Sequence, residues 1–130
     1  MSTESTASVS THILDTSVGR PAASVALSLS ARGGARERWV VLGRSATDAD
    51  GRCRDLPPLP AGTTHVRLDF ETEAYFHDQG QAEAQQDAPA PRDSGAFFPE
   101  VAITFAVTAG EHYHVPLLLN PFGYSVYRGS

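Results

Sequence analysis

The sequence contains no lysine and a single cysteine, and both scarcities exclude classes of protein. Cys53 alone cannot form an internal disulfide or a multi-thiolate zinc site, which is compatible with a reducing compartment. All 10 basic residues are arginine and the net charge is -5, so no general polycationic surface for nucleic acid or anionic lipid is expected. No apolar run approaches the roughly 18 residues of a membrane span, and residues 1–10 lack the features of a signal peptide. The sequence therefore predicts a cytoplasmic protein that binds neither nucleic acid nor membrane.

The composition that remains is typical of one folded domain. The chain has 130 residues, of which 41% are hydrophobic and 19% charged, so it can bury a core of ordinary size. Residues 1–8 are small and polar and are predicted to be flexible, which leaves 9–130 as the domain. Within it, residues 78–96 are rich in Gln, Ala, Asp and Pro without a sustained apolar period, and they are predicted to form a surface loop.

Alternation of apolar and polar residues, interrupted by Gly and Pro, predicts a fold built from about seven or eight short strands. Thr72 to His77 is predicted to form one short helix capped by Thr72. The fold class is therefore all-β, a two-sheet antiparallel β-sandwich with one short helix. The clearest strand segments are 9–14, 24–30, 38–45, 65–70 and 101–107.

The last nineteen residues carry an unusual concentration of polar and aromatic side chains. In a strand, His112 and His114 point to the same face, about 6.6 Å apart. The sequence from Asn120 to Gly123 is a turn signal, so the chain is predicted to reverse into a final strand from Tyr124 to Arg128. Because no tail follows, we expect the terminal segment itself to have a role.

These residues carry a resemblance to a known family. The run HYHVPLL and the ending YRGS resemble the signature of the 5-hydroxyisourate hydrolases, the transthyretin-related enzymes of urate breakdown. Three further motifs agree in order: Thr11 to Asp15 with Gly19-Arg20-Pro21, Thr47 to Arg52, and Phe97 to Glu100. The resemblance covers nearly the whole chain except its first residues and the interior stretch.

The resemblance implies a fold, an activity and an assembly. It implies a transthyretin-like sandwich that hydrolyses 5-hydroxyisourate by opening a cyclic amide with water, without a metal or other cofactor. It also implies a homotetramer, a dimer of dimers with active sites in the channel where two dimers meet. Small residues opposite the apolar face of the strand at 24–30 permit such contacts.

The resemblance selects His12, Arg52, His114 and Ser130 as catalytic candidates. An imidazole with an ordinary pKa of about 6.5 can take a proton from water near neutral pH, and we expect His114 to have the larger share of this role and His12 a partner role. Arg52 offers a planar fork of donors that orients the substrate and stabilises developing negative charge. Ser130 is predicted to close the site with hydrogen bonds.

Three more residues near the end of the chain have supporting roles in this interpretation. Tyr127 joins His12, Arg52 and Ser130 as a substrate-binding candidate. Tyr127 and Arg128 are also expected to position the terminal segment. His112 shares a face with His114 and either supports it or contacts substrate directly.

The residues alone leave alternatives open. A lone strand histidine such as His12 is more often structural, and on composition Arg44 and Arg54 are as plausible as Arg52. Three histidines could form a zinc site, and a Ser/His/Asp hydrolase is disfavoured by the lack of a Gly-x-Ser-x-Gly elbow. A carrier of small hydrophobic molecules with the same fold, or an immunoglobulin-like interaction domain, would not require these four separated motifs.

Overall fold

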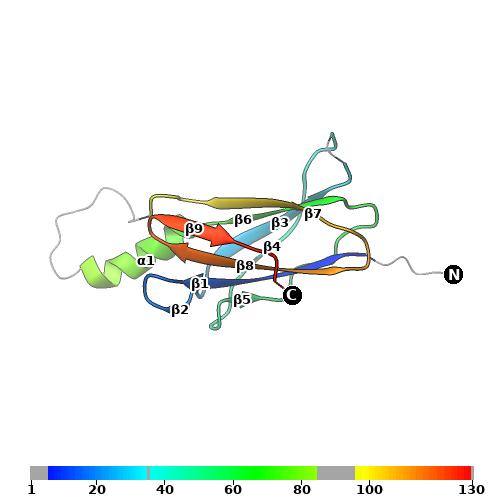
Figure 1. The fold of residues 1–130 in the computed structure, drawn as a ribbon. Helices are drawn as coiled ribbons and strands as arrows, with labels where there is room; N and C mark the ends of the chain where they lie inside the picture. The colour runs from blue at the N-terminus through cyan, green and yellow to red at the C-terminus, as the bar shows by residue number, and fades with distance from the viewer. Residues whose placement is uncertain (1–5, 35, 85–95, 130) are drawn as a thin grey trace.

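The computed structural model describes residues 6–34, 36–84 and 96–129, which form two packed β-sheets and one helix (Figure 1). This confirms the predicted β-sandwich. The first sheet contains β1 (Ser8–Asp15), β2 (Arg20–Pro21), β5 (Arg52–Cys53), β8 (His112–Asn120) and β9 (Gly123–Val126). The second contains β3 (Ala26–Arg32), β4 (Val40–Ala46), β6 (His65–Phe70) and β7 (Val101–Ala106).

The strand order places the two ends of the domain side by side. The first sheet runs β2-β1-β8-β9, with β5 also paired to β1, and the second runs β4-β3-β6-β7. All pairs are antiparallel except β1 with β8, which is parallel from Ser8 beside His112 to Asp15 beside Leu119. The sandwich is thus mostly antiparallel, as predicted, with an exception at this pair, where an early strand and a late strand run in the same direction.

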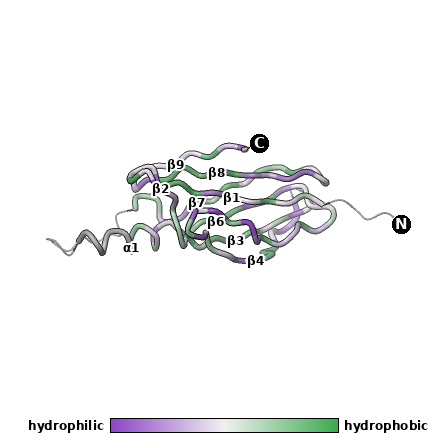
Figure 2. Tube along the Cα trace, turned by 90° about the horizontal axis from the view of Figure 1, so that it is seen from below, coloured by the Kyte–Doolittle hydropathy of each residue, from purple (hydrophilic) through white to green (hydrophobic). Residues whose placement is uncertain are grey.

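The core lies between the two layers, which Figure 2 shows one above the other. Strand alternation decides which side chains enter it. In β1, Val9, Thr11 and Ile13 are buried, whereas Ser10 and His12 are half-buried on the outer face. The largest fully buried apolar side chains are Phe70, Ile13, Leu29, Leu59, Leu68, Leu117, Leu119, Val25, Val66 and Val101.

The helix α1 (Thr72–Ala84) is longer than the sequence predicted and lies at one end of the sandwich (Figure 1). It continues past His77 through the first part of the predicted 78–96 loop, because Gln, Ala and Glu are good helix formers even without an apolar period. The rest of that predicted loop, residues 85–95, lies outside the described residues. Thr72 is already the first residue of the helix, and its hydroxyl donates to the Phe98 carbonyl at 2.6 Å.

The boundaries at both ends also differ from the prediction. β1 begins at Ser8 and Ala7 is buried, so the ordered domain begins before residue 9, while residues 1–5 lie outside the described part. The final strand β9 begins at Gly123 and ends at Val126, and a single further bridge joins Gly129 to His114. Of the described residues, no helix is both long and apolar enough to cross a bilayer.

Candidate functional site

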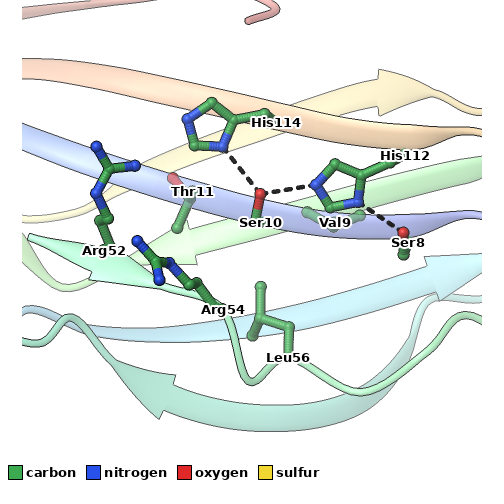
Figure 3. Close-up of a pocket in the computed structure, with 9 residues that line it drawn as sticks. All are labelled: Ser8, Val9, Ser10, Thr11, Arg52, Arg54, Leu56, His112 and His114. Atoms are coloured by element: carbon green, nitrogen blue, oxygen red, sulfur yellow. Dashed lines mark hydrogen bonds between the residues drawn. The ribbon is translucent and has the colours of Figure 1, made fainter. Parts of the chain in front are cut away.

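A cavity of about 550 Å³ lies where β5 and the segment after it meet β1 and β8. Figure 3 shows, from left to right, the guanidinium groups of Arg52 and Arg54, then the ring of His114, then Ser10 and the ring of His112. The cavity therefore has a cationic side and an imidazole side. Its lining residues are Ser8, Val9, Ser10, Thr11, Arg52, Arg54, Leu56, His112 and His114.

The imidazole side is built by the parallel pairing of β1 with β8. The register sets Ser8 beside His112 and Ser10 beside His114. Ser10 Oγ lies 2.9 Å from His112 Nε2 and 2.9 Å from His114 Nδ1, and Ser8 Oγ lies 2.6 Å from His112 Nδ1. The prediction that His112 and His114 share a face is confirmed, and each ring is held by a serine from the neighbouring strand.

The cationic side begins at the turn before β5. Asp48 accepts hydrogen bonds from the amides of Asp50 and Arg52, each at 2.9 Å, and the bond from Arg52 is the main cause that lowers the pKa of Asp48. Gly51 has a φ of 74°, and a side chain there would collide with the Ile13 carbonyl. This turn sets Arg52 opposite His12 in the β1–β5 register.

His12 belongs to the same outer face but is not among the described residues that line the cavity. Its Nε2 lies 3.1 Å from the carbonyl oxygen of Asp50. Since a carbonyl only accepts, Nε2 must carry the proton in this bond, which leaves Nδ1 of a neutral His12 as the unprotonated nitrogen. His12 is thus held beside Arg52 by the same turn that positions Arg52.

The surroundings of His114 favour its neutral form. Its half-buried position lowers the pKa of the imidazole, because burial penalises the charged ring, and the nearby charges of His12, Arg52 and His112 lower it further. A histidine with a lowered pKa is unprotonated at neutral pH and can accept a proton there. His114 therefore has the protonation state that a general base requires.

The segment after β9 returns along β8 to the site. The amide of Gly129 donates to the His114 carbonyl at 2.7 Å. Arg128 forms an ion pair with Glu111 at 3.2 Å, and its guanidinium carbon lies 4.3 Å above the Tyr113 ring. These contacts tie the segment to β8 and to the turn before it. Tyr127 is 58% exposed, and Ser130 lies outside the described residues.

The structure thus brings Arg52, His112 and His114 together around one cavity, and His12 lies opposite Arg52 in the β1–β5 register. Sequence reasoning did not single out the two serines of β1, although alternation placed Ser10 on the face of His12. Their role depends on pairing with a strand about a hundred residues away, which no local pattern shows. Within the described ranges, no group of three or more His, Cys, Asp or Glu side chains is arranged to hold a metal ion.

Fold and site together define a class: a two-sheet β-sandwich with a histidine and arginine pocket on the outer face of one sheet. The sequence matches the HIUase/Transthyretin family over residues 9–129, and the chain belongs to that family. It is 37% identical over 132 residues to the 5-hydroxyisourate hydrolase of Mus musculus, with all of both chains covered.

Two solved structures show the range of functions on this fold. The Klebsiella pneumoniae 5-hydroxyisourate hydrolase is 36% identical with a TM-score of 0.67, covering 95% of this chain and 99% of that one. Sea bream transthyretin, solved in complex with thyroxine, is 30% identical with a TM-score of 0.73, covering 93% of each chain. The family thus includes both an enzyme and a binding protein, and the residues of the site must decide between them.

Proposed function

We propose that this protein hydrolyses 5-hydroxyisourate to 2-oxo-4-hydroxy-4-carboxy-5-ureidoimidazoline, a step of urate breakdown. The observation that carries the proposal is the half-buried His114, whose pKa is lowered, on a cavity that Arg52 and Arg54 also line. A base and a group that stabilises negative charge are the two requirements for adding water to an amide carbonyl. The similarity to named hydrolases supports the choice of substrate.

In the proposed reaction His114 takes a proton from water as the water oxygen attacks the carbonyl carbon. Negative charge then grows on the carbonyl oxygen, and the guanidinium of Arg52 stabilises it and orients the ring. Arg54 lines the same side of the cavity and adds a second positive charge. His12 assists proton transfer from its place beside Arg52. No step requires a metal or other cofactor.

The terminal segment completes the proposed site. Ser130 follows Gly129, which is bonded to His114, and we assign Ser130 hydrogen bonds to substrate. Tyr127 is assigned to substrate binding and Arg128 to positioning, in keeping with the contacts of Arg128 to Glu111 and Tyr113.

We also propose a homotetramer, a dimer of dimers, located in the cytoplasm. The site lies on the outer face of a sheet, where a second subunit would cover it and restrict water, and this supports the assembly. The free, buried Cys53 is compatible with a reducing compartment.

The test follows the ultraviolet absorbance of freshly generated 5-hydroxyisourate with purified protein and with His114→Ala. We expect the wild type to accelerate the decay well beyond buffer, and loss of the base to lower the rate about 10²- to 10⁴-fold. The proposal would be contradicted if the substrate decayed no faster with the wild-type protein than with buffer alone, or no faster than with the variant. A chelator should leave the rate unchanged, and loss of activity restored by zinc would instead support a metal site.

A carrier of small molecules on the same fold is the second candidate, and the sea bream structure is the observation that favours it. The two are separated by the same assay, since a carrier binds without turnover. The imidazole and guanidinium groups on the cavity favour the hydrolase, because a carrier of hydrophobic molecules has no need of them.

A further inference from the structure

Four side chains on the imidazole side form one continuous hydrogen-bonded chain (Figure 3). It runs from Ser8 to His112, from His112 to Ser10 and from Ser10 to His114, with each link between 2.6 and 2.9 Å. The chain starts at the half-buried His114, passes the exposed His112 and ends at the half-buried Ser8. All four residues line the cavity, so the chain runs along its wall from His114 to the solvent-exposed ring of His112.

Counting protons shows that this chain has two complete arrangements. A neutral imidazole carries one N–H and each hydroxyl carries one O–H, so every link needs one donor and one acceptor. In the first arrangement His114 Nδ1 donates to Ser10, Ser10 donates to His112 Nε2, and His112 Nδ1 donates to Ser8. In the second arrangement all three bonds are reversed, and the proton of His114 is on Nε2 instead.

The first arrangement leaves Nε2 of His114 unprotonated, and in Figure 3 this nitrogen points to the side where Arg52 lies. We propose that Ser10 and His112, ending at Ser8, form a proton relay that sets the tautomer of His114 and carries a proton from the cavity to solvent. When His114 Nε2 takes a proton, its Nδ1 proton passes to Ser10, the Ser10 proton to His112 Nε2, and the His112 Nδ1 proton to Ser8. Ser8 releases its own proton to water, so one proton enters and one leaves, and tautomer exchange of the two imidazoles with rotation of the two hydroxyls restores the first arrangement before the next turnover.

This inference rests on the proposed hydrolysis, whose proton balance calls for such a path. The C–N bond of the cyclic amide breaks, a C–O bond to water forms, and the leaving nitrogen takes one proton of the water. The product acid then ionises at neutral pH, so each turnover leaves one proton to be removed. The relay removes it without accumulating charge on His114.

The charges around the relay favour passing that proton on to Ser10 over keeping it on His114. Arg52 and Arg54 line the cavity with His114, and the charges of His12, Arg52 and His112 all lower the pKa of His114. A lasting imidazolium at His114 is opposed by these groups and by burial. A concerted shift through Ser10 leaves every member of the relay neutral.

The relay is tested with Ser10→Ala, which breaks the chain, and with His112→Gln, which keeps a donor and an acceptor but cannot transfer a proton through a ring. We expect each to lower kcat about ten- to hundredfold with little change in KM, less than loss of the base itself. Ser10→Thr keeps the hydroxyl and should restore most of kcat. Thr104→Ala, which removes an exposed hydroxyl from β7 of the other sheet, is the matched control and should retain wild-type kcat.

Added imidazole buffer provides the readout that a purely structural role would not change. A small proton carrier should raise kcat of Ser10→Ala and His112→Gln in proportion to its concentration and leave the wild type unaffected. Because His112 is exposed, its replacement does not disturb the core. The His112→Gln protein is therefore expected to fold, so a change in its kcat reports on the relay and not on misfolding.

Two results would overturn the relay while the proposed hydrolysis stands: wild-type kcat in His112→Gln, or loss of activity that imidazole does not restore. Failure of the hydrolysis itself would look different, since the wild-type protein would then not accelerate substrate decay at all. Nitrogen NMR of the His114 ring supplies a readout independent of turnover. We expect the Nδ1-protonated tautomer in the free wild type and a change in the tautomer ratio in Ser10→Ala.

Discussion

His114 is held in place by contacts on its ring and on its backbone. Ser10 lies 2.9 Å from its Nδ1, and the Gly129 amide donates to its carbonyl at 2.7 Å. Its environment is both partly desolvated and positively charged, and both conditions favour the neutral ring. Ser10 and Gly129 therefore hold the residue in position, and burial with the nearby charges keeps its ring neutral.

Replacing Arg52 with Gln removes one of the charges that oppose the His114 imidazolium. We expect the pKa of His114 to rise, while burial, the larger cause, still holds it below the ordinary value of about 6.5. NMR titration of the ring measures this without requiring activity. Arg44→Gln, at an exposed position on β4 of the opposite sheet, is the control and should leave the titration unchanged. An unaltered midpoint in Arg52→Gln would contradict the electrostatic account.

The same lowered pKa predicts the acid limit of catalysis. Since the base must be unprotonated, kcat/KM should fall as the pH drops through the pKa of His114, at a midpoint below about 6.5. A pH profile of kcat/KM measures the midpoint. A midpoint above that ordinary value would mean that another group controls the reaction.

Gly129 tests how closely the terminal segment must approach His114. A Cβ at this position would lie 2.9 Å from His114 Cδ2, so an alanine forces the ring or the segment to move. We expect Gly129→Ala to lower kcat, by up to about 10²-fold if the ring is displaced by about 1 Å. Gly123→Ala is the control, because its nearest atom, Asn120 Oδ1, would be 3.9 Å away. Equal activity of both variants would show that the close approach of Gly129 to His114 has no catalytic importance.

At the scale of elements, hydrogen bonds attach the first turn of α1 to the end of the sandwich. Tyr75 donates to the buried carboxylate of Asp15 at 2.6 Å, Thr72 donates to Phe98, and the amide of Glu73 donates to the Pro99 carbonyl at 2.9 Å. Burial first, and then the Asp15 carboxylate, raise the pKa of Tyr75, so the phenol keeps its proton and donates at neutral pH. The helix is thereby fixed to the end of β1.

Tyr75→Phe removes the Tyr75 donor from the Asp15 carboxylate, which is only 2% exposed. We expect the free energy of unfolding to fall by about 1–3 kcal/mol, the usual cost of an unsatisfied buried polar group. Urea denaturation measures this, and Tyr124→Phe, at a 40% exposed ring, should cost much less. Since the site is elsewhere on the sheet, kcat should not change; a drop in kcat without loss of stability would contradict this assignment.

The elements also show what sequence patterns can and cannot predict. Strand β6 occupies the predicted residues His65–Phe70, because strict alternation is a local signal of a half-buried strand. The extension of α1 was missed because its last turns lack an apolar period. The parallel pairing of β1 with β8 depends on contacts across the whole domain. The hydrogen bonds of Ser10 to two histidines follow from that pairing, so local sequence patterns could not predict them either.

At the scale of the whole molecule, the site opens on an outer sheet face rather than between the sheets. Leu14 and Leu118 are register partners on this face and are only half-buried. An apolar pair beside a polar site is suited to contact with a second subunit. Assembly and catalysis are therefore expected to be linked.

Sedimentation at equilibrium tests this link. We expect an active species of four times the chain mass of 13.9 kDa, with the same mass for His114→Ala, since that change removes the base without altering the core. Dilution that dissociates the assembly should lower specific activity in parallel. A monomer that retains full specific activity would contradict a shared channel.

The parallel β1–β8 pair also determines when activity first becomes possible during synthesis. A nascent chain that has emerged only as far as β7 already contains both serines, His12 and the arginines, but neither imidazole of β8. Without that strand the cavity lacks its base and β1 lacks its central neighbour. Products of translation that stops before β8 should consequently be inactive.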